Sequence, residues 1–252
     1  MKHSTTVPVN ALPSAEKYAG NGPAYQRRFH VMAKPTGSAC NLDCSYCFYL
    51  HKEHLLQQEK RSYMSDETLE NFIRQYIDGQ DGEQVVFSWQ GGEPTLMGLE
   101  FFHKVVKFQQ QYKKPGQRIE NDLQTNGILI NDAWAEFLKA NHFLVGLSID
   151  GPRELHDRYR ITRSGKPTFD KVMAGVDALK RHGVPFNALV TVNRTNARFP
   201  LEVYRFVTRE LGATYVQFNP CVEPVTLPRP RPISGVMTAS LPSAAAARAP
   251  AI

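Results

Sequence analysis

Long hydrophobic runs are missing from this chain, and no stretch approaches the roughly 18 consecutive apolar residues of a membrane-spanning helix. We therefore expect no membrane partner. The polar N-terminus also lacks the apolar core of a secretion signal, which favours a cytoplasmic location. A concentrated basic stripe is absent as well, since the basic residues behind the net charge of +6 are largely spread among acidic ones. This argues against a nucleic-acid partner.

Cysteine is scarce, yet three of the four cysteines fall within eight positions. In a reducing compartment, clustered thiols indicate metal ligands rather than disulfides. Cys40, Cys44 and Cys47 have the spacing C-x3-C-x2-C. Three thiolates leave one coordination position open for chemistry, and this spacing favours an iron–sulfur cluster. The alternative is a zinc site of three cysteines and His51, which follows Cys47 by four residues.

Patterns typical of strands and helices alternate along most of the chain. Short apolar runs predict strands, and apolar residues at helical spacing, with an N-cap at Ser65, predict helices. We expect six strands, at 29–36, 84–89, 118–126, 143–149, 185–192 and 214–219, and five helices, at 65–79, 99–113, 131–141, 168–182 and 200–211.

This alternation predicts an α/β fold with parallel strands joined by right-handed crossovers. Six units make a partial (β/α)6 barrel, and the apolar strands suggest a sheet that is buried on both faces. We expect residues 28–224 to form this barrel, after a flexible N-terminal segment at 1–27. Residues 225–252, rich in Pro, Ala and Ser, should be a disordered tail. No helical pattern follows the last strand, so the sixth helix should be missing.

The tetrapeptide GGEP follows the second predicted strand. Gly91 and Gly92 have no side chains, so a ligand can touch the backbone there, and Pro94 pushes Glu93 toward an extended conformation. By itself GGEP is equally well an ordinary turn. In β/α barrels, however, chemistry lies in the loops at the carboxyl ends of the strands. The cysteines follow the first strand, so both motifs should meet at one end of the barrel.

These motifs resemble the radical S-adenosylmethionine (SAM) superfamily. The strings "ACNLDCSYCFY", "WQGGEPTL", "QTNG" and "SIDGP…HDRYR" together resemble the anaerobic sulfatase-maturating enzymes, over about residues 28–224. The resemblance implies a 4Fe–4S cluster on Cys40, Cys44 and Cys47, with SAM on the remaining iron. It also implies oxidation of a Cys or Ser in a nascent sulfatase peptide to formylglycine, and a reductase or ferredoxin-type electron donor.

The resemblance also carries over individual residues, each of which has an ordinary structural alternative. Ser148 could alternatively be a strand-end turn residue, Arg160 a solvated arginine and Val216 a core residue. The two tyrosines could simply pack the cysteine loop onto the barrel. The resemblance implies Tyr46 near the adenine, the Gly92 backbone at the methionine amino group, Ser148 at the ribose, Arg160 at the methionine carboxylate, Val216 beside the adenine and Tyr49 on the peptide side.

The chain departs from the resembled family after its sixth predicted strand. That family continues into a cysteine-rich region that binds auxiliary clusters and supplies an acid–base residue, whereas only Cys221 follows Cys47 here. We read Cys221 as a remnant of that region or an inert buried thiol. We therefore expect a truncated chain that does not convert a sulfatase peptide. Two further alternatives stay open: another radical SAM peptide-modifying maturase, and a zinc-stabilised β/α binding protein without catalysis.

Overall fold

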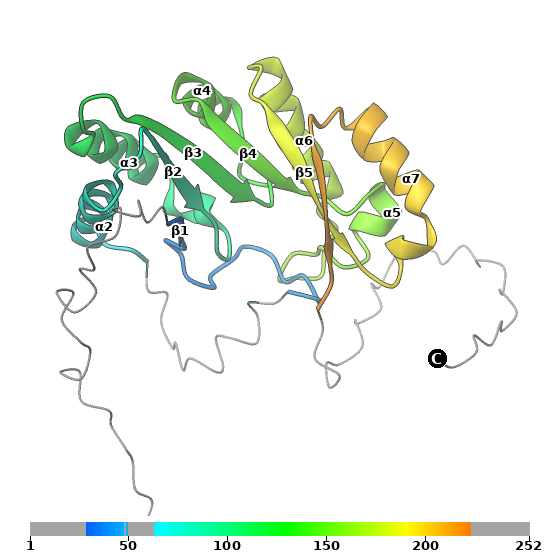
Figure 1. Cartoon of the computed structure of the whole chain (residues 1–252). Helices are drawn as coiled ribbons and strands as arrows, with labels where there is room; N and C mark the ends of the chain where they lie inside the picture. Colours follow the sequence, from blue (N-terminus) through cyan, green and yellow to red (C-terminus); the bar gives the residue numbers. More distant parts are fainter. Residues whose placement is uncertain (1–28, 48, 50–62, 223–252) are drawn as a thin grey trace, which may run out of the picture.

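The computed structural model describes residues 29–47, 49 and 63–222, which form one curved parallel sheet with helices along one face (Figure 1). The six strands lie side by side in chain order, and each pairs in parallel with the next. The predicted α/β partial barrel is confirmed. The strands are β1 (Val31–Ala33), β2 (Gln84–Trp89), β3 (Arg118–Thr125), β4 (Phe143–Ser148), β5 (Phe186–Val192) and β6 (Val216–Pro220).

The five predicted helices are present, and three shorter helical segments were not predicted. The last long helix ends in a π-helical turn, η5 (Phe206–Glu210). The predicted helices are α2 (Asp66–Asp78), α3 (Leu99–Tyr112), α4 (Asp132–Ala140), α6 (Phe169–Arg181) and α7 (Pro200–Arg205). The unpredicted segments are η3 (Pro94–Met97), α5 (Arg153–His156) and η4 (Asn196–Arg198).

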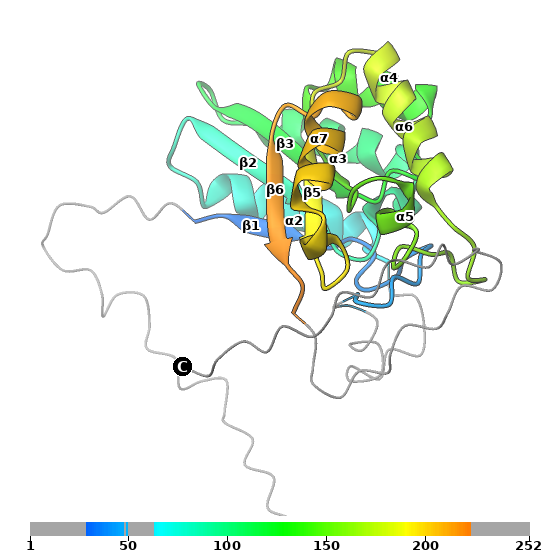
Figure 2. The same ribbon diagram turned by 90° about the vertical axis from the view of Figure 1, so that its right-hand side faces the viewer.

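The hydrophobic core lies between the sheet and the helices. On β2, Phe87 and Trp89 are fully buried and point toward the helices. Phe72 of α2 packs edge-on against Phe87, and Phe102 of α3 packs edge-on against Trp89. Ser65 caps α2 as predicted, because its Oγ accepts a hydrogen bond from the Thr68 N–H at 3.1 Å. Figure 2 shows this layering from the side, with the helices on the convex face.

The concave face is polar, which corrects the expectation of a sheet buried on both faces. Ser88 and Asp122 are register neighbours on this face, and the Ser88 hydroxyl donates to Asp122 at 2.5 Å. His30 in turn contacts Ser88 Oγ at 2.9 Å. Leu144, on the same face, is 40% exposed because no described element covers it. Hydrophobic strand sequences therefore signalled burial correctly only for the helical face.

Several expectations concern segments beyond the described residues. The N-terminal segment 1–27, the tail 225–252 and everything that follows Val222, where a sixth helix was expected to be missing, lie outside them. On β6 itself, Phe218 is 47% exposed and Tyr215, just before the strand, is 71% exposed. The described part of the chain thus leaves Tyr215 and Phe218 largely uncovered.

Candidate active site at the carboxyl ends of the strands

A cavity of about 420 Å³ opens where the carboxyl ends of the strands meet the cysteine loop. This volume lies in the range typical of small-molecule sites. The cavity brings together every site residue predicted above except Val216, which instead packs, half-buried, against the core. The predicted residues among its lining are Cys40, Cys44, Tyr46, Cys47, Tyr49, Gly92, Ser148 and Arg160.

The cysteine loop lines the cavity and is hydrogen-bonded to the two residues that flank Arg160. The N–H of Asp43 donates to the carbonyl of Ile161 at 2.9 Å, and that of Ser45 to Tyr159 at 3.2 Å. None of the four cysteines forms a disulfide. Cys221 also lines the cavity and is only half-buried, so the interpretation as a buried inert thiol is wrong.

The thiols lie in an environment that suits bound metal. Burial raises the pKa of Cys40 to about 11 and that of Cys44 to about 12, although Arg160 opposes the rise at Cys44. Both are therefore protonated near neutral pH until a metal displaces the protons. Cys40 Sγ accepts hydrogen bonds from the Leu42 N–H at 3.4 Å and from Asn126 Nδ2 at 3.7 Å. Such donors stabilise a metal-bound thiolate and tune its centre.

The geometry bears on the choice between a single ion and a cluster. Within the described ranges, no group of three or more His, Cys, Asp or Glu side chains is placed to hold one metal ion. The predicted fourth zinc ligand, His51, lies outside those ranges. A 4Fe–4S cluster asks for a different arrangement, since each thiolate binds its own iron. Three cysteines that line one cavity without converging on a single-ion site fit that group.

The GGEP turn is packed beneath the cysteine loop. The Gly92 N–H donates to Gly37 and the Glu93 N–H to Ala39, both at 2.9 Å. A Cβ on Gly92 would overlap the carbonyl oxygens of Ser38 and Ala39. The sequence predicted a ligand at these glycines, but the closest approach is made by the chain leading into Cys40. Gly92 therefore sets the position of the cysteine loop as well as lining the cavity.

Glu93 was not predicted as a site residue, yet its buried carboxylate holds two strand ends together. It accepts hydrogen bonds from the Thr95 N–H at 3.1 Å and the Thr95 hydroxyl at 2.6 Å. From the end of β3 it accepts the Thr125 hydroxyl and the Asn126 N–H, each at 2.7 Å. Burial raises the pKa of Glu93, and these donors oppose the rise. Asn126, held this way, reaches Cys40.

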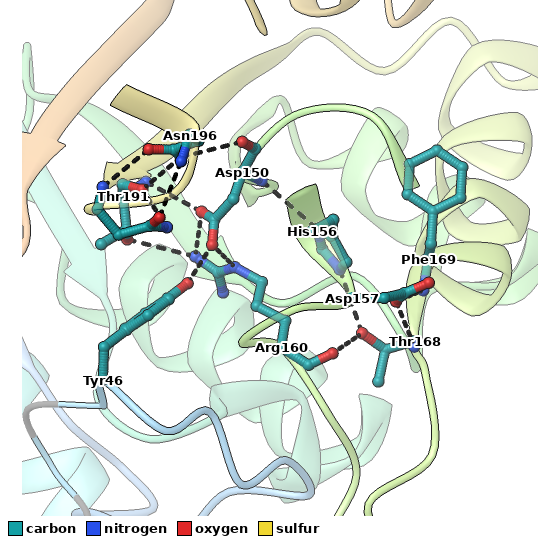
Figure 3. A network of polar contacts seen from close by, with 10 residues as sticks. Tyr46, Asp150, His156, Asp157, Arg160, Thr168, Phe169, Thr191 and Asn196 are labelled. Carbon is teal, nitrogen blue, oxygen red and sulfur yellow. Dashed lines mark hydrogen bonds and ion pairs between the residues drawn. The ribbon is translucent and has the colours of Figure 1, made fainter. Parts of the chain in front are cut away.

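A second buried carboxylate, Asp150, lies just after β4 and pairs with Arg160 (Figure 3). Arg160 Nε is 3.0 Å from Asp150 Oδ2, and Nη2 donates to Oδ1 at 3.2 Å. The Tyr46 hydroxyl also donates to this carboxylate. Arg160 is only 7% exposed, so the alternative of a solvated arginine is wrong. Burial opposes the Arg160 charge, but Asp150 raises its pKa above the usual value.

Three residues that the sequence interpretation left without a role thus organise the site: Glu93, Asn126 and Asp150. Each belongs to a quoted string and ends or follows a strand. Polar residues at strand ends were the available signal. Their partners were not predictable, because the partners lie on other loops of the barrel.

Comparison with known proteins decides the family. A sequence profile described as the Radical SAM superfamily matches residues 35–207, well over half of the chain. The chain belongs to the radical SAM superfamily. The recognised cysteine spacing and GGEP turn both fall within the matched range.

Within that superfamily, the chain is similar to anaerobic sulfatase-maturating enzymes. A serine-type enzyme of Bacteroides thetaiotaomicron is 47% identical over 199 residues, covering 79% of this chain and 48% of the relative. A cysteine-type enzyme of Clostridium perfringens is 41% identical over 199 residues, covering 77% and 52%. The chain therefore spans about half the length of these curated relatives.

A solved structure of related fold carries ligands. Native anSMEcpe with bound AdoMet and Kp18Cys peptide superimposes with a TM-score of 0.72 at 39% identity. The match covers 77% of this chain and 52% of that one. Separately, no helix among the described residues is long and apolar enough to cross a membrane.

Proposed function

We propose that this chain is the radical SAM barrel of an enzyme that oxidises a Cys or Ser of a sulfatase to formylglycine. One observation carries the proposal: three cysteines, the GGEP turn, Ser148 and Arg160 line a single cavity at the strand ends. The similarity to sulfatase-maturating enzymes at 47% and 41% identity supports this substrate class over other peptide modifications.

In this proposal, Cys40, Cys44 and Cys47 hold a 4Fe–4S cluster as thiolates. When bound, the reduced cluster supplies the electron that splits SAM into a hydrogen-abstracting radical. The chain's own residues bind and aim: the Arg160 guanidinium pairs with a carboxylate, where its planar fork suits two oxygens. Ser148 donates its hydroxyl to the ribose, the Gly92 backbone faces the methionine amino group, and the Tyr46 ring lies beside the adenine.

The partners are assigned by the same proposal. Tyr49 lines the cavity with Lys34 Nζ 5.0 Å from its ring centroid, and we place the peptide substrate on this side. A reductase or ferredoxin-type protein supplies the electron. Val216 does not line the cavity, and its place beside the adenine stays a sequence-based prediction.

The test is anaerobic reconstitution of the full chain with iron and sulfide, followed by incubation with SAM and dithionite. We expect release of 5′-deoxyadenosine, measured by chromatography, and its loss in Cys44→Ala. No 5′-deoxyadenosine from cluster-loaded protein would refute the proposed chemistry.

A sulfatase-derived peptide in the same reaction tests whether these 252 residues suffice for the conversion. Aldehyde formation is measured by mass spectrometry. From these 252 residues we expect SAM cleavage without conversion of the peptide, because one cysteine outside the cysteine loop, Cys221, is too few to hold a second cluster. Conversion would show that the residues present here suffice for the whole reaction.

A further inference from the structure

Asp150 is fully buried and contacts two side chains that line the cavity, Tyr46 and Arg160. Its carboxylate receives three partners from three segments: Arg160, the Tyr46 hydroxyl, and the backbone N–H of Thr191 at 3.0 Å. Its backbone is held as well, because its carbonyl accepts Asn196 Nδ2 at 3.1 Å and its N–H meets His156 Nδ1 at 3.4 Å. Figure 3 shows these contacts converging from different loops.

A buried carboxylate can satisfy its hydrogen-bonding capacity with fewer and simpler partners. Asp157 lies in the same segment and shows the simpler arrangement, because its Oδ1 accepts only backbone donors, from Thr168 at 2.8 Å and Phe169 at 2.9 Å. Those two bonds fix a loop. Asp150 differs in holding a cationic side chain and a tyrosine that both line the cavity. A purely structural role does not require either of them.

The Arg160 side chain gains a defined direction from this pairing. An arginine side chain has several rotatable bonds and loses rotamer entropy when it is fixed. The pairing orders the guanidinium before any ligand arrives, so binding need not order it again. Arg160 also lies over the Tyr46 ring, with Cζ 5.6 Å from the centroid. Tyr46 in turn stands between Cys44 and Cys47 in the chain.

We propose that Asp150 is a positioning residue that aims the Arg160 guanidinium into the cavity and, through Tyr46, ties it to the cysteine loop. Recognition of an anionic ligand group at Arg160 and the placement of the metal-binding loop then depend on one carboxylate. The identity of that ligand as SAM rests on the proposed function above. The role of Asp150 itself rests on the contacts of this chain.

The experiment compares Asp150→Asn with Asp157→Asn in the anaerobically reconstituted full chain, with SAM as the probe in isothermal titration. We expect Asp150→Asn to weaken SAM binding about tenfold or more, because the charge that holds Arg160 is gone. Asp157→Asn should lower the unfolding temperature but keep SAM affinity within about twofold, since its bonds reach only the backbone. Equal affinity in Asp150→Asn and the parent chain would overturn the proposal. So would an equal loss in Asp157→Asn.

A double-mutant cycle separates positioning from general support. If Asp150 acts through Arg160, then Asp150→Asn should change SAM affinity little once Arg160→Ala is present. A full additive loss in the double variant would contradict the proposal.

Tyr46→Phe keeps the ring and removes only the hydroxyl. If Asp150→Asn does not fold, this variant tests whether the contact with Asp150 supports SAM binding. It should weaken SAM binding by about threefold to tenfold, and unchanged affinity would count against the proposal. Should the parent chain bind no SAM at all, the proposed function fails. The orientation of Arg160 is then tested separately by NMR of its guanidinium N–H groups. Their signals should be sharp in the parent chain, where Asp150 holds the side chain in place, and broader in Asp150→Asn. Identical signals in both proteins would overturn the positioning role.

Discussion

The two halves of the cavity rim are each built around a buried carboxylate, but the carboxylates serve different purposes. On the β2–β3 side, Glu93 accepts four hydrogen bonds, two from backbone N–H groups and two from threonine hydroxyls. On the β4–β5 side, Asp150 pairs with a cation, Arg160. Both side chains are almost completely buried, at 1% and 0% exposure.

The β2–β3 side, which we call the holding half, holds backbone segments together, and the β4–β5 side, which we call the aiming half, orients a charged side chain toward the cavity. Glu93 has only uncharged donors, so burial raises its pKa and the carboxylate serves to join two backbone segments. The loop above it rests on Gly92, where no side chain fits. Asp150 instead orients a charged side chain that a ligand can use. We therefore expect a substitution at Gly92 to disturb metal binding, and a substitution at Arg160, which does not touch the Asp150–Tyr46 contact, to disturb ligand binding.

The largest effect is expected for Gly92→Ala on the holding half. The new Cβ would overlap the Ala39 and Ser38 carbonyl oxygens, so the chain leading into Cys40 must move. We expect near-complete loss of iron after anaerobic reconstitution, measured as iron per chain. Gly116→Ala is the control, because a Cβ there meets no atom within 4 Å, although its φ of +82° carries some strain. Retention of iron by Gly92→Ala would break the comparison between the halves.

A smaller and different effect is expected for Arg160→Ala on the aiming half. The cysteines stay in place, so iron content should match the parent chain. SAM affinity should fall by roughly 1–3 kcal/mol, the cost of losing a charge-assisted hydrogen bond. Isothermal titration of the reconstituted protein measures this. Unchanged SAM affinity would remove Arg160 from the ligand site, and loss of iron would show that the two halves are not separable.

The smallest expected effect is a pH dependence of the folding stability, and it arises from His156 on the β4–β5 side. His156 is fully buried beside Asp150 and Thr168. Burial lowers its pKa from 6.5 to about 3, and the nearby Arg160 adds to the effect. The unfolded chain therefore takes up a proton near pH 6.5, while the folded chain does not. The contribution of neutral His156 to the free energy of unfolding is complete at pH 7 and is lost as the pH falls from 6.5 toward 3.

Urea denaturation at pH 7.5 and 5.5 measures the consequence. Between these values the His156 contribution should fall by about 1.4 kcal/mol. The matched variant His156→Gln should lack that part of the pH dependence. Parallel pH profiles for the two proteins would mean that His156 titrates normally in the fold.

Much of the fold was predictable from local patterns. Apolar periods predicted every strand and the five long helices, because each spans several residues of one pattern. The four-residue helix α5 offers too little length for a period and was missed. The polar concave wall, with Ser88 and Asp122 in register, was also missed, since a short apolar strand does not reveal that only one of its faces is covered.

The site was predictable in its residues but not in its connections. The clustered cysteines and the GGEP glycines stood out in the chain itself, whereas Tyr46, Tyr49, Ser148 and Arg160 were taken from the family resemblance; all of these residues line the cavity. The hydrogen bonds that organise the site join residues far apart in the sequence: Tyr46 and Asp150 are 104 residues apart, and Thr125 and Glu93 are 32 apart. No local pattern encodes such pairs. The solvated alternative for Arg160 failed for that reason, because its burial comes from Asp150 and the loops around it.

The central claim, that three cysteines hold a cluster with one open position, is tested most directly by iron analysis combined with EPR spectroscopy. Anaerobically reconstituted protein should hold about four irons per chain, and the EPR spectrum of the reduced protein should change when SAM is added. Cys40→Ala, Cys44→Ala and Cys47→Ala should each abolish the iron and the spectrum, whereas Cys221→Ala should keep both. A colourless protein that holds a single zinc ion, or an equal loss of iron in Cys221→Ala, would contradict the assignment.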